Sequence, residues 1–164
     1  MDKIVIVPED EEEEFDDMGS HNHSMVQANL AYLFKCMGDY TVFIELSLDV
    51  SHLDLERYSV KEDLVPDIAL YPKRPLSIPH DILRMTEMPL LIVEILSPRQ
   101  GTGSILEKFG AYFALGIRSS WLVDPLTQTV HIYQSPTSRT TFSTGDVVDP
   151  SLDIHMPISE IFAS

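Results

Sequence analysis

Cysteine is nearly absent from this chain of 164 residues, which contains only Cys36. A disulfide framework and a cysteine-rich zinc site are therefore excluded, and we expect a reducing, cytoplasmic location. Because Cys36 falls in an apolar helical pattern, we expect its thiol to be buried and to take no part in chemistry. Long apolar runs are also missing: none approaches the about 20 residues that span a bilayer, so we expect no membrane partner.

Positive charge is scarce as well, since 11 lysines and arginines stand against 26 acids, a formal net charge of −15. This excludes a basic footprint over the whole chain, so a nucleic-acid partner would require local cations or bound metal ions. The acids are uneven, because nine of them face only Lys3 within residues 1–17. We expect a mobile acidic arm over residues 1–19 and a single domain over residues 20–164. An arm that covers a basic groove or docks a partner is the alternative.

Helical and strand patterns alternate along the rest of the chain. Apolar residues three and four positions apart predict a helix over 20–37, ended by Gly38. Period-two and continuous apolar runs predict strands over 40–50, between Pro66 and Pro72, and over 88–96, 119–124 and 129–134. A brief helix near 81–85 and a hairpin or edge strand over 140–148 are also expected. Ser104 and Glu107 predict a capping box for a second long helix, which stops at Gly116. The order predicts an α/β (α+β) fold in which helices flank a mixed β-sheet.

Two carboxylates stand within apolar strand patterns. Glu94 interrupts PLLIVEILSP, the most apolar stretch of the chain, where an unpaired charge would cost several kcal/mol. A salt bridge or a helix cap is the ordinary explanation for such an acid. Asp67 has an equivalent position directly after Pro66. If the two strands are neighbours, the carboxylates converge, and oxygen ligands of this kind favour Mg²⁺ or Mn²⁺ over Zn²⁺.

Lys108, in the helix after Glu94, is a candidate for a cation beside these acids. It shares a helical face with Tyr112, four positions on, whereas a solvent-exposed lysine is the ordinary interpretation. Since the negative charges of two nearby acids must be offset, we interpret Lys108 as a residue that orients attacking water or stabilises charge on a phosphoryl group. Asp124 ends an apolar strand before Pro125, which is typical of a residue that caps a turn.

Four segments in a fixed order, VPDIALYP, LLIVEILSP, EKFGAYFALGI and SSWLVDPLTQTVHIY, resemble a bacterial family of restriction-endonuclease-like proteins. That family is similar to the PD-(D/E)XK nucleases, and the resemblance covers residues 20–162. It implies a restriction-endonuclease-like core with a mixed β-sheet flanked by helices. It also implies that Asp67, Glu94 and the main-chain carbonyl of Ile95 hold the metal ion.

The chain departs from the wider nuclease pattern two residues after the second acid, where Leu96 stands in place of a lysine. In the bacterial family the lysine lies in the following helix, and Lys108 occupies that place. Members also carry an acid before the first helix and a histidine near its start. The acid cannot be assigned within the acidic run. His21 and His23 both match the histidine, and His23 borders the inward face of the helix, where a structural role is the alternative to a catalytic one.

These features predict a Mg²⁺- or Mn²⁺-dependent endonuclease that hydrolyses DNA, with Asp67, Glu94, Lys108 and His23 as its catalytic residues. A catalytically degenerate nuclease fold that serves as an interaction or dimerisation module is the alternative. The net charge predicts weak or conditional affinity for DNA, and a homodimer is expected because one subunit of this size cuts one strand. The expected phosphate contacts are Lys73, Arg74, Arg84, Arg99 and Arg118.

Overall fold

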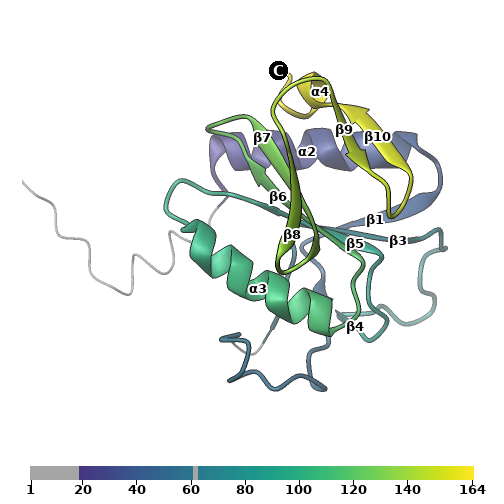
Figure 1. The fold of residues 1–164 in the computed structure, drawn as a ribbon. Coiled ribbons are helices and arrows are strands. Elements are labelled where there is room, and N and C mark those ends of the chain that lie inside the picture. The colour runs from purple at the N-terminus through teal and green to yellow at the C-terminus, as the bar shows by residue number, and fades with distance from the viewer. Residues whose placement is uncertain (1–18, 61–62) are drawn as a thin grey trace, which may run out of the picture.

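The computed structural model describes residues 19–60 and 63–164. A six-stranded sheet in the order β1-β3-β5-β6-β7-β8 forms its centre, with helices on both faces (Figure 1). Its strands are β1 (Tyr40–Ile44), β3 (Ile68–Pro72), β5 (Leu91–Ile95), β6 (Ser119–Asp124), β7 (Thr129–Ser135) and β8 (Ser138–Phe142). The sheet is mixed, because β5 and β6 are parallel and the other neighbours are antiparallel. The expected fold class is confirmed.

One face of the sheet is covered by α2 (His21–Cys36), the hairpin of β9 (Asp146–Asp149) and β10 (Ile154–Pro157), and α4 (Ile158–Ile161) (Figure 1). The helix expected over 20–37 is confirmed, with Ser20 as N-cap and Gly38 after its end at φ +80°. Val26, Leu30 and Phe34 are buried on its inner side, and the Phe34 ring lies 5.3 Å from that of Trp121. Each such side chain contributes about 1.5–3 kcal/mol of apolar burial.

The opposite face carries α3 (Thr102–Ala114) and the small parallel pair β2 (Ser47–Leu48) and β4 (Arg84–Met85). Ile105, Phe109 and Tyr112 are fully buried beneath α3. The strand β5 is buried at all five residues because alternate side chains enter the two cores, which explains its continuous apolar sequence. In the described part of the chain, no helix has the length and apolar character to cross a membrane.

Three local expectations are wrong because tertiary contacts override the sequence pattern. The strand expected over 40–50 breaks at Glu45, whose φ is +51° and whose N–H donates to the Asp67 carbonyl. Residues 81–85 form no helix, since Arg84 and Met85 pair with β2 instead. No capping box forms: Gly101 is the N-cap of α3, and the Ser104 hydroxyl donates to its carbonyl at 2.8 Å.

Cys36 is exposed, not buried as expected. It lies two residues after Phe34, and two helical steps of about 100° turn its side chain away from the core that Phe34 enters. The acidic arm expected over residues 1–19 lies outside the described residues apart from Gly19. The arm and the single domain over 20–164 therefore stay predictions.

Candidate active site

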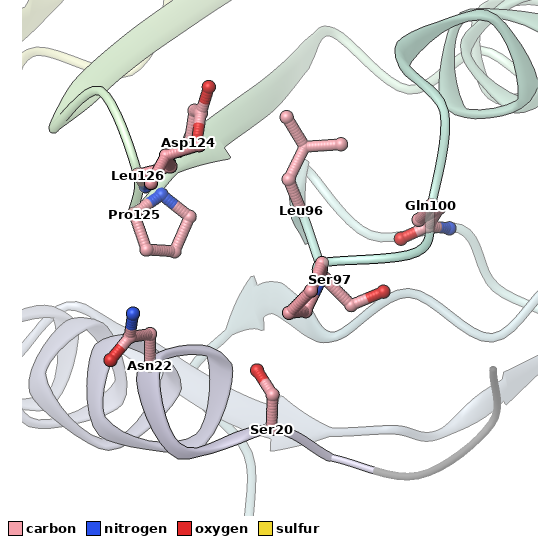
Figure 2. A pocket seen from close by; sticks show the side chains of 9 residues that line it. Ser20, Asn22, Leu96, Ser97, Gln100, Asp124, Pro125 and Leu126 are labelled. Atoms are coloured by element: carbon pink, nitrogen blue, oxygen red, sulfur yellow. The ribbon is translucent and has the colours of Figure 1, made fainter. Parts of the chain in front are cut away.

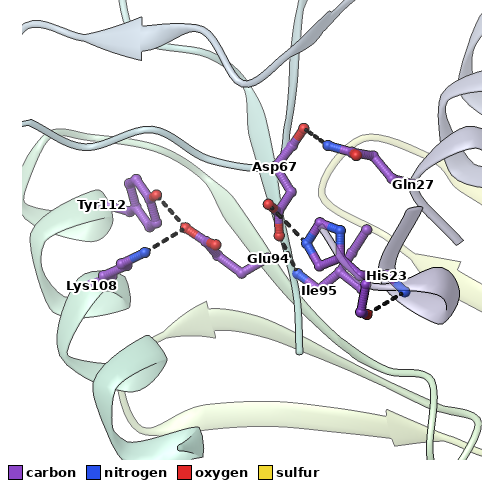
Figure 3. A network of polar contacts seen from close by, with 8 residues as sticks. His23, Gln27, Asp67, Glu94, Ile95, Lys108 and Tyr112 are labelled. Carbon is purple, nitrogen blue, oxygen red and sulfur yellow. Dashed lines mark hydrogen bonds and ion pairs between the residues drawn. The ribbon is translucent and has the colours of Figure 1, made fainter. Parts of the chain in front are cut away.

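The candidate site lies at one end of the central sheet, where β3 begins and β5 ends. Ile68 pairs with Val93 in the antiparallel register of these strands. One step further along the same register, Asp67 falls opposite Glu94. The structure therefore brings together the two carboxylates that the sequence singled out, with α3 on one side of them and α2 on the other (Figure 3).

Glu94 is an ionisable group held inside the fold, with only 3% of its surface exposed. Burial raises its pKa to about 7, the charge of Asp67 adds to this rise, and the ammonium of Lys108 opposes it. The Tyr112 hydroxyl donates to Glu94 Oε1 at 2.6 Å, and Lys108 Nζ lies 3.8 Å from the same oxygen. Burial and the nearby Glu94 hold the pKa of Tyr112 well above its usual value, so its hydroxyl remains a donor.

Asp67 uses both carboxylate oxygens. The main-chain N–H of Ile95 donates to its Oδ2 at 2.6 Å, and His23 Nε2 lies 3.1 Å from its Oδ1. The hydrogen bond to Asp67 raises the pKa of His23 above its usual value, and burial of the ring opposes that rise. His23 Nδ1 is buried and has no hydrogen-bond partner among the described residues. His23 thus belongs to the cluster and fixes the orientation of Asp67.

The part of Ile95 that contacts the cluster is its N–H, while the resemblance assigned a role to its carbonyl. The Ile95 side chain is buried in the core between the sheet and α2. Successive strand residues face opposite sides of the sheet, so the Ile95 side chain points away from the side chain of Glu94, the residue before it. The role of the Ile95 carbonyl as a metal ligand stays a prediction.

Two residues of the cluster were missed by the sequence reasoning. Gln27 donates its side-chain N–H to the Asp67 carbonyl at 3.0 Å, and its spacing of four from His23 could have indicated it. The Glu45 N–H donates to the same carbonyl at 3.3 Å, and the Glu45 charge contributes to the raised pKa of His23. No pattern indicated Glu45, because the alternation of apolar residues continues through the break in the strand.

Most of the cations expected to contact phosphate lie at the opposite end of the sheet. Lys73 and Arg74 follow the last residue of β3, and Arg118 precedes Ser119, which pairs with the first residue of β5. Several of these cations have partners within the fold: Arg74 is 2.7 Å from Glu87, Arg84 is 2.6 Å from Asp63, and Lys73 donates to the Gly38 carbonyl at 3.2 Å. Arg99, in the connection after β5, lies at the end of the sheet that carries the cluster.

The donors near Glu94 fit a hard divalent cation in kind. One carboxylate lies directly before β3 and the other in the neighbouring strand β5. Because the charge of Asp67 raises the pKa of Glu94, additional positive charge would stabilise the pair. Within residues 19–60 and 63–164, no group of three or more His, Cys, Asp or Glu side chains is arranged to hold a metal ion. The remaining ligands would be main-chain oxygen and water, which Mg²⁺ commonly retains.

Asp124 caps a turn, as expected from the sequence. Asp124 Oδ1 accepts the N–H groups of Leu126 at 2.9 Å and Thr127 at 3.4 Å, as a turn cap does. Trp121 is fully buried, and its indole N–H donates to Asp149 at 2.8 Å. Asp149 is a second buried carboxylate that the sequence did not single out, and its partners satisfy it away from the cluster.

The mixed sheet with helices on both faces, and the two carboxylates where β3 begins and β5 ends, agree with the restriction-endonuclease-like fold that the resemblance implies. A family model described as "Uma2: Putative restriction endonuclease" matches residues 10–159. The chain belongs to this Uma2 family, so the resemblance found in the sequence is confirmed.

The fold is similar to that in "Crystal structure of a putative nuclease belonging to DUF820 from Anabaena variabilis ATCC 29413 at 1.96 A resolution". The TM-score is 0.66 with 23% sequence identity, over 88% of this chain and 82% of that one. At this identity the likeness shows the shared fold alone. No curated protein matches the chain.

Proposed function

We propose that the chain is a metal-dependent endonuclease that hydrolyses phosphodiester bonds of DNA. The observation that carries the proposal is the pair of Asp67, directly before β3, and Glu94 in the neighbouring strand β5, with the Lys108 ammonium 3.8 Å from Glu94. Membership of the family described as "Putative restriction endonuclease" supports it. Asp67, Glu94 and the Ile95 carbonyl would hold Mg²⁺ or Mn²⁺. When bound, such an ion supplies Lewis-acid chemistry, since it withdraws charge from a phosphoryl oxygen and makes water more acidic.

The side chains around the carboxylates have separable roles. Lys108, whose side chain is 35% exposed, reaches solvent and Glu94 at once, so its ammonium can donate to an attacking water or to a phosphoryl oxygen. Tyr112 holds the orientation of Glu94, and His23 holds that of Asp67. His23 and Tyr112 therefore act on the carboxylates as positioning residues, while Lys108 faces the substrate.

A cleavage assay on plasmid and single-stranded DNA with Mg²⁺ or Mn²⁺ tests this function. We expect cleavage by the natural chain, and a loss of about a hundredfold or more in Asp67→Asn, Glu94→Gln and Lys108→Met. Lys35→Met, which removes an exposed lysine from α2, is the matched control and should cleave normally. Full activity in Lys108→Met would overturn the role of the lysine. Full activity in both carboxylate variants would overturn the site.

A degenerate nuclease fold that serves as an interaction module is the second candidate. Two observations favour it. Both carboxylate oxygens of Asp67 already have partners within the protein. Among the described residues, no group of three His, Cys, Asp or Glu side chains could hold a metal ion. Thermal unfolding with and without Mn²⁺ separates the two, because an ion that binds only the folded chain raises Tm. An unchanged Tm, together with no cleavage, would favour the interaction module. The homodimer stays a prediction, which the molar mass in solution tests.

A further inference from the structure

A cavity of about 310 Å³ has the lining that Figure 2 shows. It lies at the same end of the sheet as the carboxylate cluster, since Leu96 follows the last residue of β5. Its walls come from the first turn of α2, the connection between β5 and α3, and the turn between β6 and β7. We propose that this cavity takes one unpaired nucleobase of the strand being cut. The substrate is then single-stranded or locally unpaired DNA. The inference rests on the proposed nuclease function and deepens it by naming the class of substrate.

The cavity and the cluster are built from the same two segments of chain. Asn22 lines the cavity and precedes His23, which contacts Asp67. Leu96 lines it from the other side and follows Ile95, whose N–H donates to Asp67. The Leu96 N–H donates to the Val123 carbonyl at 2.9 Å, so the cavity rests on the ends of the parallel pair β5 and β6. A phosphate at the carboxylates therefore has its neighbouring base beside the cavity.

The lining has the chemistry that a nucleobase requires. Leu96, Pro98, Pro125 and Leu126 supply apolar surface for the faces of a ring, and Leu126 stands at the rim with 89% of its surface exposed. Polar groups for the ring edge come from Ser20, Asn22, Ser97 and Gln100. The volume is at the lower end of the about 300–1,000 Å³ of small-molecule sites, which suits one base and excludes a duplex.

Two polar side chains of the lining already form hydrogen bonds within the protein, which limits the groups that they can offer to a base. Asn22 Oδ1 lies 2.8 Å from His21 Nδ1, which leaves the Asn22 amide N–H groups to donate to a base. The Asp124 carboxylate accepts two main-chain N–H groups of its own turn, which offsets its charge at the cavity wall. The cavity therefore offers hydrogen-bond donors and apolar surface to the ring.

The distribution of charge favours an unpaired strand over a duplex. Affinity for a duplex comes mainly from cations that neutralise phosphates. Three of the five expected phosphate contacts, Lys73, Arg74 and Arg118, lie at the other end of the sheet, and Arg99 and Lys108 lie at the end with the cluster. A single strand can instead gain affinity by seating a base against apolar surface. A base within a duplex enters such a cavity only after it is unstacked and flipped out, which costs free energy.

Binding of a fluorescein-labelled 12-nucleotide single strand and of the matching duplex, measured with Ca²⁺ in the buffer, tests the inference. We expect the natural chain to bind the single strand about tenfold more tightly than the duplex. Asn22→Trp should fill the cavity from an exposed helical position and weaken single-strand binding about tenfold, with duplex binding unchanged. Ala28→Trp, also exposed on α2 and outside the lining, is the matched control.

Equal affinity for the two DNA forms, or natural single-strand affinity in Asn22→Trp, would overturn the base site. Gln100→Trp fills the cavity from the opposite wall and replaces Asn22→Trp if that variant does not fold. Because binding is measured apart from cleavage, the two proposals can fail separately. Mg²⁺-dependent cleavage without a preference for single strands overturns the base site alone. A preference for single strands without cleavage overturns the nuclease function alone.

Discussion

Replacing Glu94 with glutamine should make the stability of the fold less sensitive to alkaline pH, because a buried carboxylate is costly when it ionises. The pKa of Glu94 is raised from 4.5 to about 7, with burial as the main cause. The folded chain therefore holds the proton more tightly than the unfolded chain does. The stability that this proton contributes is present below pH 4.5 and is lost as the pH rises through about 7.

The magnitude follows from the two pKa values. The difference between about 7 and 4.5, at about 1.4 kcal/mol for each pH unit, corresponds to about 3 kcal/mol lost by pH 8. Glutamine does not ionise, so Glu94→Gln avoids this loss. Its amide oxygen can accept from Tyr112 in place of Oε1, which leaves the amide N–H groups at the position of Oε2. Leaving such buried donors unpaired costs about 1–3 kcal/mol at every pH. The diagnostic quantity is therefore the change with pH of the difference between the two chains.

Urea unfolding followed by tryptophan fluorescence measures that difference. Trp121 is the single tryptophan and is fully buried, so its emission reports global unfolding. Between pH 4.5 and pH 8, without divalent ions, the stability of Glu94→Gln should rise relative to the natural chain by about 3 kcal/mol. Glu107→Gln, which removes an exposed carboxylate from α3, should follow the natural chain at every pH. Parallel profiles for the natural chain and Glu94→Gln would refute the reasoning.

Three further predictions concern the partners of the carboxylates. Tyr112→Phe removes the 2.6 Å hydrogen bond to Glu94 and should lower the free energy of unfolding by about 1–3 kcal/mol at pH 8. Thermal unfolding should show this loss as a lower Tm, and an unchanged Tm would contradict the strength of that bond. Asp67→Asn should lower the pKa of His23, because a neutral amide oxygen replaces the charged carboxylate oxygen that stabilises the protonated ring. NMR titration of the imidazole measures this, and a constant pKa would contradict the pairing. Asp149→Ala should destabilise the fold by about 1–3 kcal/mol, seen in urea unfolding, while folded protein cleaves DNA normally; impaired cleavage would link this second carboxylate to the site.

The elements that sequence predicted well are those whose local pattern agrees with their tertiary place. The continuous apolar sequence of β5 predicts a strand buried on both faces, and its alternate side chains do enter two cores. Gly38 and Gly116 end their helices at φ +80° and +90°, a region that glycine enters without steric cost. The opposition of Asp67 and Glu94 followed from assuming that two apolar strands are neighbours, and the antiparallel register makes them so.

What sequence could not predict depends on contacts between distant segments. The break at Glu45 is held by a hydrogen bond to Asp67, 22 positions later, which no local pattern encodes. Arg84 and Met85 are drawn into a strand by β2, although their own segment favours a helix. The pairing of His23 with Asp67 joins α2 to the residue that precedes β3, and only the fold brings the two side chains within 3.1 Å.

The position of Lys108 explains how an apolar residue can stand at position 96. Lys108 and Tyr112 lie one helical turn apart on α3, and both reach Glu94 Oε1, at 3.8 and 2.6 Å. Because Lys108 brings its ammonium to the carboxylate from the helix, no lysine is required on the strand at position 96. Leu96 is then available to line the cavity beside the site. Moving the cation to the helix thus adds apolar surface where the proposed base would lie, while the charge next to Glu94 is kept.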